Sequence, residues 1–275
     1  MALQIIALIG GGNMGRSLAG GLIRAGWPMQ QVLAVDPDAG QRERVRRETG
    51  IFTTADGVAA IAGADVVVLA VKPQGMGNTV RTLAEALRAR RPLVITVAAG
   101  IPMAAIHAWV GARLPLVRAM PNTPALIGAG ATGLYCGTDV TPEQRQLAER
   151  ILGAVGIVQW VEKEELIDVV TALSGSGPAY FFLMMEGLIQ AAVELGLTPA
   201  QARALTVQTA LGAARMAGAG TDDPAELRRQ VTSPGGTTEQ AVRVLEESGL
   251  KETLIRAVRA ARQRSEELAR KFGEG

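Results

Sequence analysis

The first half of the chain alternates between short apolar runs and segments with helical spacing. Near-continuous apolar runs occupy residues 3–9, 31–36, 64–71 and 92–99. Such runs are typical of parallel strands that are buried on both faces. The segments between them, including a charged stretch that ends at Gly50, are predicted to be helices. This alternation with short connections predicts a doubly wound, mostly parallel α/β sheet with right-handed crossovers.

The second half of the chain has a helical pattern throughout. No strand is expected after residues 157–161, and from about residue 165 the apolar positions recur at helical spacing. Helices are predicted over residues 179–196, 199–217, 224–231, 238–248 and 250–271. The pattern therefore predicts an α/β domain over residues 1–164 and an all-α domain over residues 165–275.

The helix predicted over residues 179–196 is apolar on nearly all sides. A helix of this kind is buried in the folded protein. Its own domain offers it few apolar partners, so we expect it to pack against a second copy of the chain. The prediction is a homodimer or a larger assembly.

Two long uncharged stretches raise the question of a membrane span. Residues 93–112 begin with a β-branched cluster and contain Gly100 and Pro102, which favours a strand, a turn and a helix over a span. Residues 169–185 are interrupted by the sequence SGSGP, which is expected to form a loop that leads into a buried helix with Pro178 near its first turn. No signal peptide is expected either, because no basic residue precedes the first apolar run. We therefore expect a cytoplasmic protein without a membrane segment.

A glycine-rich loop lies between the first predicted strand and the helix that follows it. Gly10, Gly12 and Gly15 form a G-x-G-x-x-G motif at this point. The first glycine allows a tight turn, the second lets a pyrophosphate approach the backbone, and the third lets helix and strand pack closely. The start of the helix offers free N–H groups to the phosphates. The motif in this context predicts a dinucleotide-binding Rossmann domain.

Asp36 ends the second predicted strand, about 20 residues beyond the glycine motif. A carboxylate here binds the ribose hydroxyls of NAD and repels the 2′-phosphate of NADP, which favours NADH. The downstream Arg42 and Arg44 would soften that preference. As an alternative or additional role, Asp36 could cap the helix that begins after Pro37.

Composition excludes several classes of function. The formal net charge is +2, without a long basic block, and aromatic residues make up 3% of the chain. Neither a basic footprint nor a base-stacking platform is therefore present, and no nucleic-acid partner is expected. Cys136 is the single cysteine, so no intrachain disulfide can form, as suits a reducing compartment.

Few residues in the chain are suited to strong acid–base catalysis. The one histidine, His107, is expected to be structural, and a zinc site of the usual ligands is not expected. The four lysines are Lys72, Lys163, Lys251 and Lys271, so none falls within the core of the helical domain. Oxidation of an alcohol normally needs a positioned base, whereas reduction of a protonated C=N bond needs only hydride delivery and a hydrogen bond to nitrogen.

The sequence SPGGTT at residues 233–238 is a candidate site for a substrate carboxylate. Ser233 and a Pro-Gly-Gly turn lead into a helix that begins near Thr237, so free N–H groups and three hydroxyls come together. The two glycines suggest a close approach of the backbone to a ligand. The alternative is a capping box formed by Thr237 and Gln240, which would leave the hydroxyl of Thr238 free.

Taken together, these motifs resemble those of the pyrroline-5-carboxylate reductase family. The matching segments are IGGGNMG (9–15), AVKP (70–73), AAG (98–100), RAMPNTPA (118–125), LSGSGPAY (173–180) and SPGGTT (233–238), in the order and spacing of the family. The resemblance covers essentially the whole chain. It implies reduction of 1-pyrroline-5-carboxylate to L-proline by NADPH or NADH, and dimers that interlock through the helical domain and often assemble into decamers.

The resemblance also assigns site residues. Cofactor contacts are implied for Gly10, Gly11, Gly12, Asn13, Met14, Gly15, Ala70, Val71, Lys72, Pro73, Ala98, Ala99 and Gly100, and also for Asp56, where relatives often have asparagine. Substrate contacts are implied for Ser176, Gly177, Pro178, Ser233, Gly235, Gly236, Thr237 and Thr238. Thr238 is the candidate catalytic residue, with its hydroxyl hydrogen-bonded to the ring nitrogen.

Several of these residues could instead have purely structural roles. Pro73 and Pro121 could end strands, Arg118 could anchor a loop, and Lys72 could be a solvated strand end. Two other functions are also considered. A β-hydroxyacid dehydrogenase would need a catalytic lysine in the first long helix of the second domain, which this chain lacks. A non-catalytic dinucleotide-binding protein would not need the SPGGTT loop.

Overall fold

The structure, a computed structural model, describes residues 4–273 and divides into two compact units. The first unit comprises the described residues up to Ser176 together with those from Ala260 onward, and the second comprises Gly177–Arg259. The first part of this unit thus ends at Ser176, whereas the sequence predicted a domain boundary at residue 164. The chain also returns to that unit within its last helix, which a division into two consecutive domains does not anticipate.

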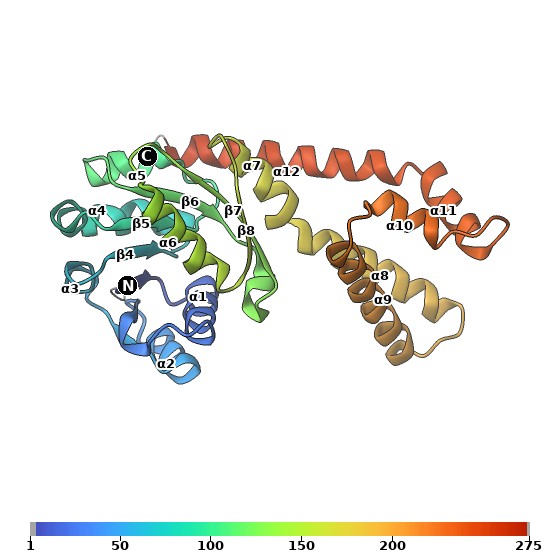
Figure 1. Cartoon of the computed structure of the whole chain (residues 1–275), viewed down its shortest axis with the longest axis horizontal. Helices are drawn as coiled ribbons and strands as arrows, with labels where there is room; N and C mark the ends of the chain where they lie inside the picture. Colours follow the sequence, from blue (N-terminus) through green and yellow to red (C-terminus); the bar gives the residue numbers. More distant parts are fainter. Residues whose placement is uncertain (1–3, 274–275) are drawn as a thin grey trace. The chain divides into compact units, whose positions relative to one another are not determined.

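An eight-stranded mixed sheet forms the centre of the first unit (Figure 1). Its spatial order is β3 (Phe52–Thr54), β2 (Val32–Val35), β1 (Ile6–Ile9), β4 (Val66–Leu69), β5 (Leu93–Thr96), β6 (Leu116–Met120), β7 (Gly130–Cys136) and β8 (Gly156–Trp160). Strands β1 to β6 run parallel, whereas β7 pairs antiparallel with β6 and parallel with β8. The order reverses between β1 and β4, and open α/β sheets bind ligands at such a switch point.

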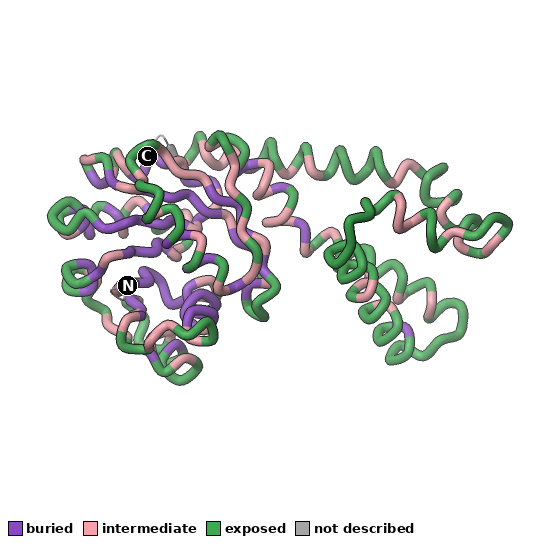
Figure 2. Tube along the Cα trace, in the orientation of Figure 1, coloured by how far each residue is buried: buried purple, intermediate pink, exposed green. Residues whose placement is uncertain are grey.

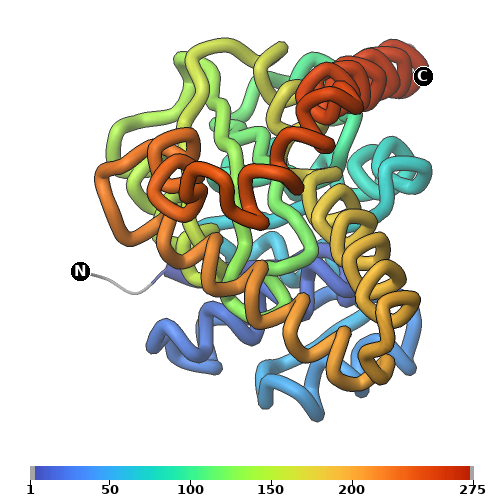
Figure 3. The backbone as a smooth tube through the Cα atoms, turned by 90° about the vertical axis from the view of Figure 1, so that its right-hand side faces the viewer, coloured from blue at the N-terminus to red at the C-terminus, as the bar shows by residue number. Residues whose placement is uncertain are grey.

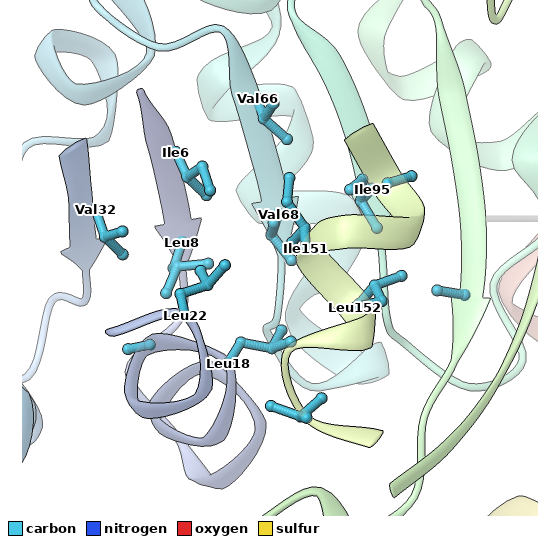
Figure 4. Close-up of a cluster of buried hydrophobic side chains, with 14 of the residues drawn as sticks. Ile6, Leu8, Leu18, Leu22, Val32, Val66, Val68, Ile95, Ile151 and Leu152 are labelled. Carbon is cyan, nitrogen blue, oxygen red and sulfur yellow. The ribbon is translucent and has the colours of Figure 1, made fainter. Parts of the chain in front are cut away.

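Helices cover both faces of this sheet. They are α1 (Asn13–Arg24), α2 (Ala39–Thr49), α3 (Gly57–Ala62), α4 (Pro73–Arg90), α5 (Met103–Val110), α6 (Pro142–Gly153) and α7 (Leu166–Val170), with the 3₁₀ turns η1 (Met29–Gln31) and η2 (Thr123–Ile127). Alternate strand residues enter different cores. Ile6 and Leu8 pack with side chains of α1 and α6 (Figure 4), while Ala7 and Ile9 face the core beneath α3, α4 and α5. The predicted α/β class is confirmed.

Three strands were not predicted, because their sequences lack a continuous apolar run. Strand β3 is only three residues long, β6 carries Arg118 at its centre, and β7 contains two glycines and a threonine. Each of the four predicted runs contains one observed strand, β1, β2, β4 or β5, because these strands are buried on both faces.

The second unit is entirely helical. It holds α8 (Gly177–Glu194), α9 (Pro199–Ala219), α10 (Pro224–Gln230), α11 (Thr237–Glu247) and the first part of α12 (Leu250–Gly273). Helices α8 and α9 contact each other, and Figure 3 shows the yellow α8 leading into the orange α9. The predicted helices all occur. The prediction of a loop at residues 174–178 is wrong. Thr171–Gly175 form a π-helical turn, η3, and α8 starts two residues after it.

The apolar helix α8 is not buried within one chain. Among residues 177–259 only Gly177 and Ala202 are buried, and Figure 2 shows α8 and α9 largely exposed. Phe181 and Phe182 are each 60% exposed and Leu183 is 69% exposed. Among the described residues, the helical stretch Leu166–Glu194 is long and apolar enough to cross a membrane by length and composition alone, and one such stretch is weak evidence for a membrane span. The second unit therefore has almost no core of its own.

Candidate dinucleotide site and substrate loop

A cavity of about 700 Å³ opens at the carboxyl ends of β1, β2 and β4, beside the switch point of the sheet. Its lining residues are Ile9, Gly10, Gly12, Val35, Asp36, Pro37, Gln41, Ala55, Asp56, Gly57, Val58, Ala70, Val71, Lys72, Asn78, Thr79, Thr82 and Leu83. Apolar walls with a few polar groups are usual for a cofactor site.

Seven of the predicted cofactor residues line this cavity. They are Gly10, Gly12, Asp36, Asp56, Ala70, Val71 and Lys72. Eight others do not line it: Gly11, Asn13, Met14, Gly15, Pro73, Ala98, Ala99 and Gly100. The last three follow β5, one strand beyond β4, and Pro73 is the first residue of α4 rather than the end of a strand.

The three motif glycines are required for three different reasons. Gly10 has φ +114°, and a Cβ there would lie 2.7 Å from the carbonyl oxygen of Ala70. At Gly15 a Cβ would lie 1.9 Å from the carbonyl oxygen of Gly10, so α1 can approach β1 only without a side chain. Gly12 has an ordinary φ of −69°, and a Cβ there would meet no protein atom within 4 Å. Protein packing therefore does not require Gly12, and the space beside it fits a pyrophosphate that lies against the backbone.

Asp36 holds the glycine loop and the turn that follows β2. Its Oδ2 accepts a hydrogen bond from the N–H of Gly11 at 2.7 Å, and its Oδ1 accepts one from the N–H of Asp38 at 2.9 Å. The helix-capping role proposed for Asp36 is wrong, because Asp38 is the N-cap of α2 and accepts from Gly40 and Gln41. The carboxylate of Asp36 lies at the cavity and is fixed in orientation.

Cations flank this part of the cavity. Arg42 Nη1 donates to the carbonyl oxygens of Asp36 at 2.9 Å and Pro37 at 2.8 Å, so its charge lies next to the turn. Lys72 lines the cavity at the N-cap position of α4 and makes no capping hydrogen bond with its side chain. Asp56 also lines the cavity, and its Oδ1 caps α3 through the N–H of Ala59 at 2.9 Å.

The sequence analysis missed four polar residues of the cavity. Gln41 lies on the first turn of α2, and Asn78, Thr79 and Thr82 lie on α4. Because Asn78 and Thr82 are four residues apart, they share one face of the helix. The sequence gives no clear signal for them, because polar residues between the buried apolar positions of α4 are also typical of the solvent face of an amphipathic helix.

Asn13 and Arg16 stabilise the start of α1. Arg16 Nη2 donates to Asn13 Oδ1 at 2.7 Å, and Arg16 Nη1 pairs with Glu48 at 3.0 Å. A hydrogen bond from Arg44 lowers the pKa of Glu48, burial opposes this, and the charge of Arg16 adds to the lowering. The side chain of Asn13 therefore supports the helix that carries the glycine loop.

The SPGGTT loop forms the N-terminal end of α11 in the second unit. Gly236 is its N-cap, Gly236 N–H donates to Ser233 O at 3.0 Å, and Gly235 has φ +73°. The predicted capping box of Thr237 and Gln240 is wrong, because Glu239 Oε2 instead accepts from Gly235 N–H at 2.8 Å. A left-handed φ and a tight turn therefore account for the two glycines without a ligand.

The hydroxyl groups of Thr237 and Thr238 are available for a ligand. Neither forms a hydrogen bond with the described part of the chain, and both lie in the first turn of α11, where backbone N–H groups lack helical partners. Thr238 is half-buried, whereas Thr237 is exposed. Gln230, three residues before Ser233, donates through Nε2 to Asp222 Oδ2 at 2.9 Å.

The remaining candidates have structural roles. His107 Nε2 lies 3.3 Å from Leu114 O, outside the cavity, and burial raises the pKa of the Cys136 thiol, which disfavours the reactive thiolate. Arg118 is 3% exposed and pairs with Glu164 at 3.0 Å, so it anchors the segment after β8, as one reading of the sequence predicted. No group of three potential metal ligands occurs among residues 4–273.

Comparison with known proteins agrees with this geometry. A family model described as pyrroline-5-carboxylate reductase dimerisation matches residues 164–268, and one described as NADP oxidoreductase, coenzyme F420-dependent, matches residues 5–100. A Pseudomonas aeruginosa pyrroline-5-carboxylate reductase is 49% identical over 274 residues, covering 100% of both chains.

Solved structures extend the match to three dimensions. A pyrroline-5-carboxylate reductase from Coxiella burnetii has a TM-score of 0.92 at 45% identity and covers 97% of this chain and 99% of its own. A Plasmodium falciparum pyrroline carboxylate reductase with NADP bound has a TM-score of 0.86 at 28% identity, with coverages of 98% and 99%. The chain belongs to the pyrroline-5-carboxylate reductase family.

Proposed function

We propose that this protein reduces the C=N bond of 1-pyrroline-5-carboxylate to give L-proline, with NADPH or NADH as the reductant. The observation that carries the proposal is the end-to-end match to reductases of that name, 49% identical over the full length of both chains. The cavity at the switch point supports it, because Gly12 leaves space where a pyrophosphate would lie against the backbone.

The residues of the cavity fit a nicotinamide dinucleotide. Gly12 and the free N–H groups of α1 would take the phosphates, Asp36 would bind the adenosine ribose, and Lys72 would add positive charge. When bound, the reduced cofactor supplies a hydride to the substrate carbon. We also assign cofactor contacts to the predicted residues that do not line the cavity, with Ala98, Ala99 and Gly100 serving the nicotinamide end.

The SPGGTT loop is proposed to hold the substrate. The N–H groups of Thr237 and Thr238 at the start of α11 would bind the substrate carboxylate. The Thr238 hydroxyl would accept a hydrogen bond from the N–H of the iminium and donate to the electron pair that forms on nitrogen as hydride adds. Ser176, Gly177 and Pro178 would also contact the ring. Glu239 places its carboxylate on Gly235 N–H, which leaves the N–H groups of the two threonines for the substrate.

The proposed chemistry needs no strong base. The ring imine enters as the protonated iminium, hydride adds to its carbon, and the electron pair of the C=N bond moves to nitrogen. The nitrogen keeps its proton, and the oxidised cofactor remains. This agrees with the absence of any lysine or histidine from residues 177–247. The same absence opposes a β-hydroxyacid dehydrogenase, whose first long helix in the second domain would carry a lysine.

The first test is the initial rate of cofactor oxidation with pyrroline-5-carboxylate, measured with NADH and NADPH in parallel. We expect turnover with both. A folded protein that binds either cofactor but shows no turnover would instead support the non-catalytic dinucleotide-binding alternative.

Asp36 is proposed to favour NADH over NADPH. Its carboxylate would lie next to the 2′-phosphate of NADP, where two negative charges repel. We expect Asp36→Ser to raise the ratio of kcat/KM for NADPH to that for NADH about tenfold, a difference of about 1.4 kcal/mol. Asp38→Ser is the matched control, because it removes the same charge from the same turn, does not line the cavity and keeps a good N-cap. An unchanged ratio in Asp36→Ser would leave Asp36 only its hydrogen bonds to Gly11 and Asp38.

We propose that α8 and α9 are covered by a second copy of the chain. Almost no residue of the second unit is buried within one chain, and its exposed side chains include Phe181, Leu183 and Leu188. Large apolar side chains that are exposed on two contacting helices indicate an interface. The proposal includes further assembly of dimers, as in the decamers of the family, and a cytoplasmic location.

Sedimentation tests the assembly. We expect the wild type to have at least twice the mass of the 28.7 kDa chain. Leu183→Glu places a charge in the covered surface, and we expect it to weaken the dimer by at least about tenfold in Kd. Phe52→Glu is the control, since Phe52 is 68% exposed but lies on the edge strand β3. A monomeric wild type would refute the proposal.

A further inference from the structure

The π-helical turn η3 (Thr171–Gly175) lies immediately before Ser176, a residue to which we assign a substrate contact. Ser176 N–H donates to Thr171 O, five residues back, at 2.8 Å. The position of Ser176 therefore depends on this turn. Turns of this type inside helices frequently occur at functional sites.

Pro178 leaves one carbonyl of this turn without its usual helical partner. In a regular α-helix the carbonyl oxygen of Ser174 would accept from the N–H of residue 178, four positions on. Proline has no N–H, so that bond cannot form. An unpaired carbonyl in a partly buried position costs free energy comparable to a lost hydrogen bond.

Asn122 supplies the missing donor. Its Nδ2 donates to Ser174 O at 2.9 Å, and its Oδ1 accepts from Ala131 N–H at 2.9 Å. Asn122 is 9% exposed and lies two residues beyond the end of β6, so a nearly buried side chain joins the turn to the start of β7. The turn is also tightly packed here, since a Cβ on Gly175 would lie 2.6 Å from Met120 Cε.

We propose that Asn122 is a positioning residue that compensates for Pro178 and thereby fixes Ser176 for substrate binding. Two sequence motifs, RAMPNTPA and LSGSGPAY, thus meet through the hydrogen bond from the Asn122 side chain to the Ser174 carbonyl and through the packing of Met120 against Gly175. The substrate part of this inference rests on the proposed function, whereas the compensation for Pro178 does not.

The test combines kinetics with amide hydrogen exchange of peptides that cover Thr171–Phe182. We expect Asn122→Ala to raise the KM for pyrroline-5-carboxylate about tenfold, because small displacements of a positioning group have effects of this order. The Kd for NADPH should stay within about twofold, since Asn122 does not line the cavity. Exchange of the Ser176 amide should be faster by about tenfold as the turn loosens.

Two further variants bracket this result. Asn122→Asp keeps the acceptor for Ala131 N–H but cannot donate to Ser174 O, so we expect the same changes even if Asn122→Ala fails to fold. Ser174→Ala is the matched control, because it removes only the hydroxyl that bonds to Val170 O and keeps the carbonyl bonded to Asn122. Its KM and exchange should stay near wild type.

A double-mutant cycle isolates the compensation. Pro178→Ala restores an N–H at that position, which can serve the Ser174 carbonyl. In that background, we expect Asn122→Ala to change Ser176 exchange by less than about threefold. Equal effects in both backgrounds would overturn the compensation, and an unchanged KM in Asn122→Ala would overturn the positioning role. A wild type without turnover would refute the proposed function and leave the exchange result to decide the rest.

Discussion

Thr238→Ala is expected to lower kcat by roughly 10- to 1000-fold, the range for losing a positioned hydrogen bond or proton donor. The expectation follows from the place of Thr238 in the first turn of α11, half-buried and with a hydroxyl that bonds to no other described residue. In the proposed reaction this hydroxyl bonds to the ring nitrogen as the C=N electron pair moves there. Because that charge change occurs in the transition state, the loss should fall on kcat more than on KM.

Steady-state kinetics with saturating cofactor measures this effect. Thr238→Ser keeps the hydroxyl and should recover most of the activity. Thr232→Ala is the control for a nearby threonine, since its hydroxyl is already bonded to Arg228 O at 2.6 Å. If Thr238→Ala turns over within about twofold of wild type, the hydroxyl has no role in the chemistry.

The dinucleotide fold was predictable because its signals are local. Gly10 and Gly15 each meet a separate steric requirement, Gly12 leaves open space beside the backbone, and the buried parallel strands read as apolar runs. The place of Asp36 at the end of β2 followed from the same pattern. The sequence did not predict the hydrogen-bond partners of Asp36. Asp36 and Asp38 are both plausible N-caps of α2, and only the turn geometry assigns that role to Asp38.

The parts that sequence reasoning missed depend on contacts distant in the chain. The bond between Asn122 and Ser174 spans 52 positions, and nothing in the local pattern of either segment predicts it. The capping box at Thr237 fits the local motif, yet the left-handed Gly235 shifts the cap to Gly236 and lets Glu239 bond to the loop. Helix α8 is exposed within one chain although its sequence is apolar on nearly all sides. The apolar pattern indicated a second copy of the chain only indirectly, because it does not show which surface covers the helix.

The largest effect on stability is expected at Arg118. Its Nη1 pairs with Glu164 at 3.0 Å and its Nη2 lies 3.6 Å from Asp168. Arg118 is 3% exposed and the side chain of Asp168 is 9% exposed, while Ser265 Oγ of α12 donates to Asp168 Oδ1 at 2.6 Å. Strand β6, helix α7 and the end of α12 are therefore joined at one buried charge cluster.

Arg118→Met is expected to lower the free energy of unfolding by about 3 kcal/mol, because it leaves the buried carboxylate of Asp168 and the partly buried one of Glu164 without their counter-charge. Urea unfolding at a fixed protein concentration measures it, since assembly makes stability depend on concentration. Arg113→Met is the matched control. It removes a guanidinium that is 70% exposed and pairs with Asp139, and we expect a loss below about 1 kcal/mol.

A second variant separates charge from packing at this cluster. Arg118→Met combined with Asp168→Asn removes the least exposed of the uncompensated charges and keeps an acceptor for Ser265 Oγ, so it should regain at least about 1 kcal/mol. If Arg118→Met costs no more than Arg113→Met, the cluster contributes no more than a surface pair. In that case the burial of Arg118 would reflect the packing of its stem between β6 and α7 and not its charge.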